Sequence, residues 1–209
     1  MRKLIIAIVI GLSFAIGANA QLKGVSSANE GIVNNLKKGN SNVTSLSSKF
    51  TETQKMSFLT TSTEKAGDFY FVKPNQLSML YTNGEVMIIN KENVTIGKKG
   101  KIRNVKSKNK QVEALAQTLL ACMSGDVSSL NGTLESAKQD VKEIVLNVKV
   151  SFTVGKSMIS NLELKYDKKD MTFKSLKMIQ ADGSYQLYEL QNKEKNKDIT
   201  PSVFNYTKK

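Results

Sequence analysis

The sequence contains no histidine and no tryptophan, one cysteine and only two prolines. Without histidine, a Ser-His-Asp triad, a Cys-His pair and every histidine-containing metal site are excluded. The single cysteine, Cys122, cannot form an internal disulfide, so the fold must depend on its apolar core. Cys122 also lies on an apolar helical pattern, which is unusual for a nucleophile. We therefore expect no enzymatic activity and no cofactor.

The N-terminus has the pattern of a secretory signal peptide. Arg2 and Lys3 precede an apolar run over residues 4–18, and Ala18-Asn19-Ala20 is a small-x-small cleavage site. The apolar run is short for a membrane span, although an uncleaved anchor is the alternative. Gln21, not cysteine, follows the cleavage point, so a lipid anchor is not expected. We expect a signal peptide over residues 1–20 and one soluble periplasmic domain over residues 21–209.

Negative charge is scarce, and the formal net charge is +13. Such an excess favours contact with anionic surfaces, including phospholipid, acidic protein and nucleic acid. Export argues against nucleic acid, and the lysines are scattered instead of gathered with aromatic side chains. The simpler interpretation is a well-solvated surface on a monomer.

Most of the mature sequence has the alternation that is typical of β-strands. Residues 144–154 place six apolar side chains on one face of one strand. Short turns such as Asn83-Gly84 and Asp182-Gly183 separate the strands, which predicts antiparallel neighbours. We expect eleven strands, at residues 46–56, 68–72, 76–81, 86–90, 94–98, 102–105, 144–154, 159–166, 172–180, 184–190 and 202–206.

Two segments have helical spacing instead. Residues 26–38 predict a short helix that ends at Gly39 and Asn40. Residues 109–124 predict an amphipathic helix that ends before Gly125, and a short helical turn is expected at residues 126–130. A single mid-sequence helix cannot form a bundle, so its apolar stripe must pack on the sheet. The fold class is mainly β with an α lid.

The strands have more apolar surface than one face of a sheet ordinarily needs. Methionine is frequent among these side chains and adapts its shape to changing apolar partners. A concave sheet lined in this way, with a helix across its mouth, would form a cavity for acyl chains; an ordinary filled core is the alternative. The expected lining residues are Phe69, Phe71, Leu77, Met79, Tyr81, Met87, Ile89, Leu115, Leu119 and Met123.

Several motifs follow one another in a definite order along the chain. They are Phe50-Thr51-Glu52, then Gly67-Asp68-Phe69-Tyr70-Phe71-Val72-Lys73-Pro74, then Tyr81 with Asn83-Gly84, and finally Asp182-Gly183-Ser184-Tyr185 and Ile199-Thr200-Pro201. Taken together, these motifs resemble the outer-membrane lipoprotein carrier family, LolA. Each motif is loose, but their order and spacing cover nearly the whole mature chain.

The resemblance implies a curved antiparallel sheet that forms an incomplete β-barrel, with helices covering its concave face. It also implies that acyl chains of lipoproteins bind there, with Phe50 in the lining, and that the chain is not an enzyme. The implied partners are an inner-membrane ABC-type lipoprotein-releasing complex and an outer-membrane acceptor, between which the carrier ferries its cargo.

Three positions depart from the family pattern. Lys73 stands where the family has an arginine that holds the lid, Leu77 replaces a cavity aromatic, and Glu52 replaces a glutamine. Lysine lacks the planar fork of arginine, so lid closure is expected to be weaker or built differently. Strand parity places Lys73 at the rim beside Phe69 and Phe71, with Pro74 ending the strand. A solvated lysine without a role is the alternative.

Two other functions suit the same fold. One is a periplasmic lipid- or glycolipid-binding protein, and the other is an interaction protein that senses mislocalised lipoproteins. The sensor would normally have an additional domain, and the lipid acceptor would usually be anchored at its N-terminus.

Overall fold

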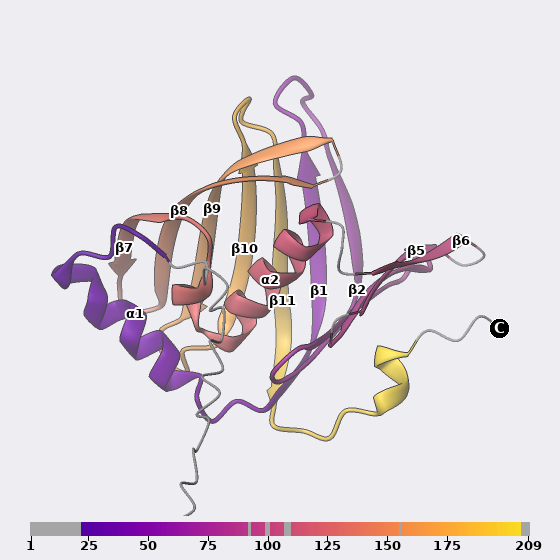
Figure 1. Cartoon of the computed structure of the whole chain (residues 1–209), viewed down its shortest axis with the longest axis horizontal. Helices are drawn as coiled ribbons and strands as arrows, with labels where there is room; N and C mark the ends of the chain where they lie inside the picture. The colour runs from indigo at the N-terminus through magenta and orange to yellow at the C-terminus, as the bar shows by residue number, and fades with distance from the viewer. Residues whose placement is uncertain (1–21, 92, 99–100, 107–109, 155, 206–209) are drawn as a thin grey trace, which may run out of the picture.

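The computed structural model describes residues 22–91, 93–98, 101–106, 110–154 and 156–205 (Figure 1). For residues 102–106 and 110–113 only the backbone is described. The expected signal peptide, residues 1–20, lies outside these ranges. None of the helices within the described ranges is long and apolar enough to span a membrane.

One antiparallel sheet of eleven strands forms the body of the molecule. Its spatial order is β6-β5-β4-β3-β2-β1-β11-β10-β9-β8-β7, and the two outer strands, β6 and β7, do not pair with each other. The expectation of a single sheet that is not closed into a barrel is therefore confirmed. The strands are β1 (Ser45–Lys55), β2 (Ser62–Val72), β3 (Gln76–Tyr81), β4 (Glu85–Asn90), β5 (Asn93–Lys98), β6 (Lys101–Lys106), β7 (Thr133–Gln139), β8 (Glu143–Val154), β9 (Ser157–Asp167), β10 (Phe173–Gln180) and β11 (Tyr185–Lys195).

The sheet wraps around a helix. Strands β3 to β6 turn away from the plane of the other strands, and helix α2 (Lys110–Ser124) crosses the concave side (Figure 1). The hydroxyl of Tyr166 on β9 donates to the backbone carbonyl of Cys122 on α2 at 3.1 Å. The expected helix on the concave face is thus found over residues 110–124, and residue 109 lies outside the described residues.

Helix α1 (Ser27–Gly39) lies beside the β7 edge and buries Val33 and Leu36. The chain before it adds to that edge, because the Leu134 amide donates to the Lys23 carbonyl at 2.8 Å. A 3-10 turn, η1 (Val127–Ser129), follows α2 where a helical turn was expected. Lys37 of α1 forms an ion pair of 2.9 Å with Asp126, next to η1.

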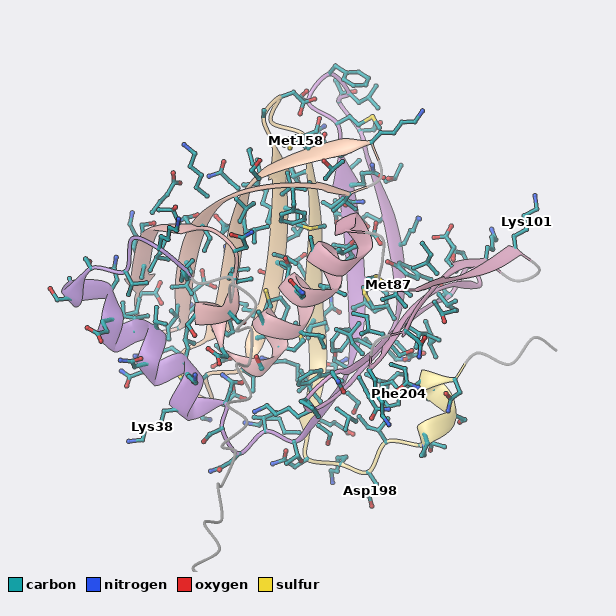
Figure 2. All side chains as sticks on the ribbon, in the orientation of Figure 1. Lys38, Met87, Lys101, Met158, Asp198 and Phe204 are labelled. Carbon is teal, nitrogen blue, oxygen red and sulfur yellow. The ribbon has the colours of Figure 1, made fainter. Side chains whose placement is uncertain are left out.

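The expected strand at residues 202–206 is wrong. Residues Pro201–Phe204 form a 3-10 turn, η2, and Tyr206 lies outside the described residues. Proline has no amide hydrogen to give to a sheet and suits the first position of a helical turn. The side chain of Phe204 is buried against Val86 and Ile88 of β4. Figure 2 shows it on the side of these strands that faces away from α2.

The number of strands is still eleven because β7 was not expected. Its sequence, TLESAKQ, lacks apolar alternation and buries only Leu134 fully. The first half of β2, residues 62–66, is also polar, and it becomes a strand by pairing with residues 51–55 of β1. In both cases, pairing with a neighbouring strand stabilises a segment whose own sequence does not predict a strand.

Candidate functional site

The concave face is a set of side-chain rows that run across neighbouring strands. The register aligns Leu46, Phe71 and Leu77 with Ile89 and Val94, and all five side chains are buried. The next row is mainly Phe69, Met79, Met87 and Ile96. An apolar surface therefore extends from β1 to β5 beneath α2.

The structure brings the eleven expected lining residues into one cluster. Eight are buried and three, Tyr81, Met87 and Leu115, are partly buried and packed against it. Met87 lies on the side of its strand that faces α2 (Figure 2). The eight buried residues are Phe50, Phe69, Phe71, Leu77, Met79, Ile89, Leu119 and Met123. Their contact with acyl chains stays a prediction.

Gly67 allows two aromatic rings to meet in this cluster. It is paired with Phe50 on one side and Tyr81 on the other. A Cβ at Gly67 would lie 2.8 Å from Cε1 of Phe50 and 2.2 Å from the Leu80 carbonyl oxygen. Because that space is free, Phe50 and Tyr81 pack edge to face, with ring centroids 5.0 Å apart.

One end of the concave face is polar, and its centre is Glu52. Glu52 is only 6% exposed, and its carboxylate accepts a hydrogen bond from the Tyr81 hydroxyl. Tyr188 lies opposite Glu52 on β11 and Lys65 lies opposite it on β2. Burial, followed by the nearby Tyr188 and Glu52, raises the pKa of Tyr81, and burial and Glu52 raise the pKa of Tyr188. Both hydroxyls therefore remain protonated.

A pocket of about 390 Å³ opens at this polar end. Its apolar wall includes Tyr81, Met87 and Ile96, which also pack on the core cluster. Its polar wall includes Glu52 and the ion pair between Lys65 and Glu85, whose charged atoms are 2.6 Å apart. The pocket is therefore next to the expected lining residues.

Lys73 lies at the opposite end of the same strands. Its ammonium donates to the backbone carbonyl of Asn40, the residue that caps the C-terminus of α1. Burial lowers the pKa of Lys73. Lys73 therefore contacts the residue that caps α1, and not α2, the helix that crosses the concave side. Pro74 follows it in the turn between β2 and β3.

Asn40 connects four segments at this end. Its side-chain amide donates to the carbonyls of Leu36 at 2.9 Å and Met171 at 2.7 Å. At the end of α2, Gly125 has φ +69°, and a Cβ there would lie 2.5 Å from Nδ2 of Asn40. A glycine is needed at 125 for both reasons. The junction of Asn40, Lys73, Met171 and Gly125 thus holds the ends of both helices to the sheet.

Sequence reasoning missed three of these residues. The sequence pattern predicts Asn40 only as the end of a helix, and it indicates no role for Tyr166 or Tyr188. Their partners lie far away in the sequence, so no local pattern indicates them. The buried parity of Tyr166 on its strand was the one available signal.

The lone thiol and the acidic residues are the groups to which the usual requirements of a nucleophile and a metal site apply. Cys122 is fully buried, and burial raises the pKa of its thiol. Within the described ranges, no group of three or more cysteine, aspartate and glutamate side chains could hold a metal ion. The arrangement is suited to holding an apolar ligand.

The fold has relatives among solved structures. An uncharacterized conserved protein from Thermus thermophilus has a TM-score of 0.52 at 10% identity, over 87% of this chain and 95% of that one. A DUF1329 family protein from Desulfovibrio piger has a TM-score of 0.50 at 9% identity, over 88% and 98%. A LolA superfamily protein from Nitrosomonas europaea has a TM-score of 0.44 at 7% identity, over 85% and 97%. At these identities the first two likenesses show a shared fold.

Comparison with curated proteins gives no significant sequence match. The sequence model of the family described as outer membrane lipoprotein carrier protein LolA, however, matches residues 41–207. That range includes every strand of the sheet and helix α2. The chain belongs to the LolA family of outer membrane lipoprotein carrier proteins.

Proposed function

We propose that this protein binds the acyl chains of lipoproteins between the concave face of its sheet and α2, and carries them through the periplasm from the inner to the outer membrane. The observation that supports this most is the apolar surface from β1 to β5, covered by α2, in a chain of the LolA family. In this proposal the protein acts without catalysis, as a monomer. It receives cargo from an ABC-type releasing complex and delivers it to an outer-membrane acceptor.

The energetics fit a carrier. Each methylene kept from water contributes about 0.8 kcal/mol, so long acyl chains need an apolar cover throughout transit. In the described structure the expected lining is largely buried by the protein's own side chains. Cargo would therefore enter as α2 moves away from the sheet. The lining side chains would then exchange their contacts with α2 for contacts with the acyl chains.

The test compares lipid binding with folding stability in the same variants. Met87 and Leu115 are better targets than Leu119, because they are only partly buried and a polar residue there costs less stability. We expect Met87→Asp and Leu115→Asp to weaken binding of a triacylated lipopeptide at least about tenfold, with little change in the urea midpoint. Val141→Asp is the control, since Val141 is 91% exposed.

Equal losses of binding and stability would favour a filled core without a ligand. Transport itself needs a second assay. Purified protein should release a lipoprotein from inner-membrane vesicles that contain the ABC-type complex and transfer it to outer-membrane vesicles. Binding without transfer would favour the alternative, a periplasmic lipid- or glycolipid-binding protein or a lipoprotein sensor.

A further inference from the structure

The carboxylate of Glu52 differs from the other acidic groups in its surroundings. Glu52 is a buried residue, and its carboxylate belongs to none of the ion pairs formed among the described side chains. Lys65, its neighbour across the strand, pairs with Glu85. The hydrogen bond that Glu52 accepts comes from the neutral hydroxyl of Tyr81. A carboxylate buried without a cation is costly unless a ligand supplies one.

The position of Glu52 fits a ligand with an acyl tail. Glu52 lines the pocket of about 390 Å³, and the same pocket is lined by Tyr81, Met87 and Ile96 of the apolar face. A ligand whose chains lie under α2 can therefore place a polar group beside Glu52. Tyr81 and Tyr188 also line the pocket. The Tyr81 hydroxyl donates to Glu52, and the raised pKa values keep both hydroxyls neutral, so neither supplies the charge that would balance the carboxylate.

We infer that Glu52 is a recognition site for a primary ammonium group carried on a diacylglyceryl-type lipid. This inference rests on the proposed function, since it names the cargo class of the same cavity. Two sources have this chemistry: a diacylated lipoprotein whose N-terminal cysteine keeps its free amine, and the headgroup of phosphatidylethanolamine. A lipoprotein that is N-acylated at the cysteine lacks the ammonium, so the site favours the diacylated form.

The decisive ligands are lipopeptides that differ only at the amine. One has a dipalmitoylglyceryl cysteine with a free amine and a short uncharged peptide. The second has the same amine acetylated, which removes the charge without adding a long chain. We expect the mature protein to bind the free amine about tenfold more tightly, which corresponds to about 1.4 kcal/mol.

Glu52→Gln is the matched variant, because glutamine has nearly the same shape and still accepts from the Tyr81 hydroxyl. It should bind both lipopeptides equally and as tightly as wild type binds the acetylated one. Glu64→Gln is the control. Glu64 is exposed and lies opposite Thr53, the residue after Glu52, so its side chain is on the other face of β1 and β2. This substitution removes one negative charge near Glu52 without changing the pocket. It should keep the tenfold preference.

Equal affinities in wild type, or a preference that persists in Glu52→Gln, would overturn the inference. Both results leave acyl binding intact, whereas failure to bind either lipopeptide would overturn the proposed function itself. Parallel measurements with phosphatidylethanolamine and phosphatidylglycerol separate the sources. If wild type prefers phosphatidylethanolamine and this preference depends on Glu52, the site is assigned to phospholipid headgroups. If the Glu52-dependent preference is seen only with the lipopeptide, the site is assigned to lipoprotein cargo.

Discussion

Replacing Lys73 tests the junction that ties the helices to the sheet. Lys73→Leu removes the hydrogen bond from the ammonium to the Asn40 carbonyl. A hydrogen bond from a charged donor contributes about 1.5–3 kcal/mol in a dry setting. Lys73 is only partly buried, and the Asn40 carbonyl still accepts from the Val43 amide at 3.1 Å. We therefore expect the free energy of unfolding to fall by about 1 kcal/mol, which is less than that range.

A change of this size lowers the melting temperature by about 2–4 °C for a domain of this length. Thermal unfolding followed by circular dichroism is sufficient to measure it. Lys73→Arg restores a donor and should recover most of the loss. If Lys73 has the role that the resemblance implies for the family's arginine, the Lys73→Leu variant should also hold a triacylated lipoprotein more tightly and deliver it to acceptor membranes more slowly.

The two measurements separate the possible roles of Lys73. A lower melting temperature with unchanged delivery would make the lysine a structural tie alone. Unchanged stability and unchanged delivery in both variants would refute the reasoning and leave Lys73 as a solvated side chain.

Four further changes probe other contacts. Asn40→Ala loses both side-chain hydrogen bonds of a buried amide, so the free energy of unfolding should fall by about 2 kcal/mol in urea titrations. Tyr166→Phe removes the donor to the Cys122 carbonyl, and hydrogen exchange of α2 amides should accelerate while the sheet stays protected. Phe204→Ala should lower the free energy of unfolding by about 3 kcal/mol, because it leaves a space beside Val86 and Ile88, yet it should leave lipopeptide affinity unchanged. Burial alone would raise the pKa of Asp170, but hydrogen bonds from Thr172 and Lys195 outweigh it and hold this pKa at about 2, below its ordinary 3.8. The stability that the ionised carboxylate contributes above pH 4 should therefore decline as the pH falls towards 2. After a discount for partial exposure, Asp170→Asn should remove about 1 kcal/mol of that dependence in acid titrations of unfolding.

The sequence predicted the elements whose apolar side chains repeat with the period of a strand or a helix. Strand β8 alternates strictly, and four of its six expected inward side chains, Ile144, Leu146, Val148 and Val150, are buried. Helix α2 was found because its apolar stripe has the period of a helix. Strand parity decides which face a side chain occupies, so it predicted that the side chains on the strands would share one apolar cluster. Their contact with acyl chains stays a prediction.

The remaining features depend on contacts between distant parts of the chain. Strand β7 is formed by its pairing with β8 and by the bridge to Lys23, neither of which the sequence TLESAKQ indicates. Asn40 and Met171 meet across 131 residues of sequence. The sequence indicates Glu52 only as a departure from the family pattern. Lys65 pairs with Glu85 and not with Glu52, and this choice depends on the packing of three strands.

The open sheet has two free borders, and each discourages association between copies of the protein. Strand β6, with the sequence KIRNVK, places Lys101, Arg103 and Lys106 along six residues. A second molecule that paired border to border there would bring these like charges together, which is unfavourable. At the other border, the segment at Lys23 occupies part of the hydrogen-bonding edge of β7. In the proposed carrier, both outer strands would therefore give a second copy little edge on which to extend the sheet.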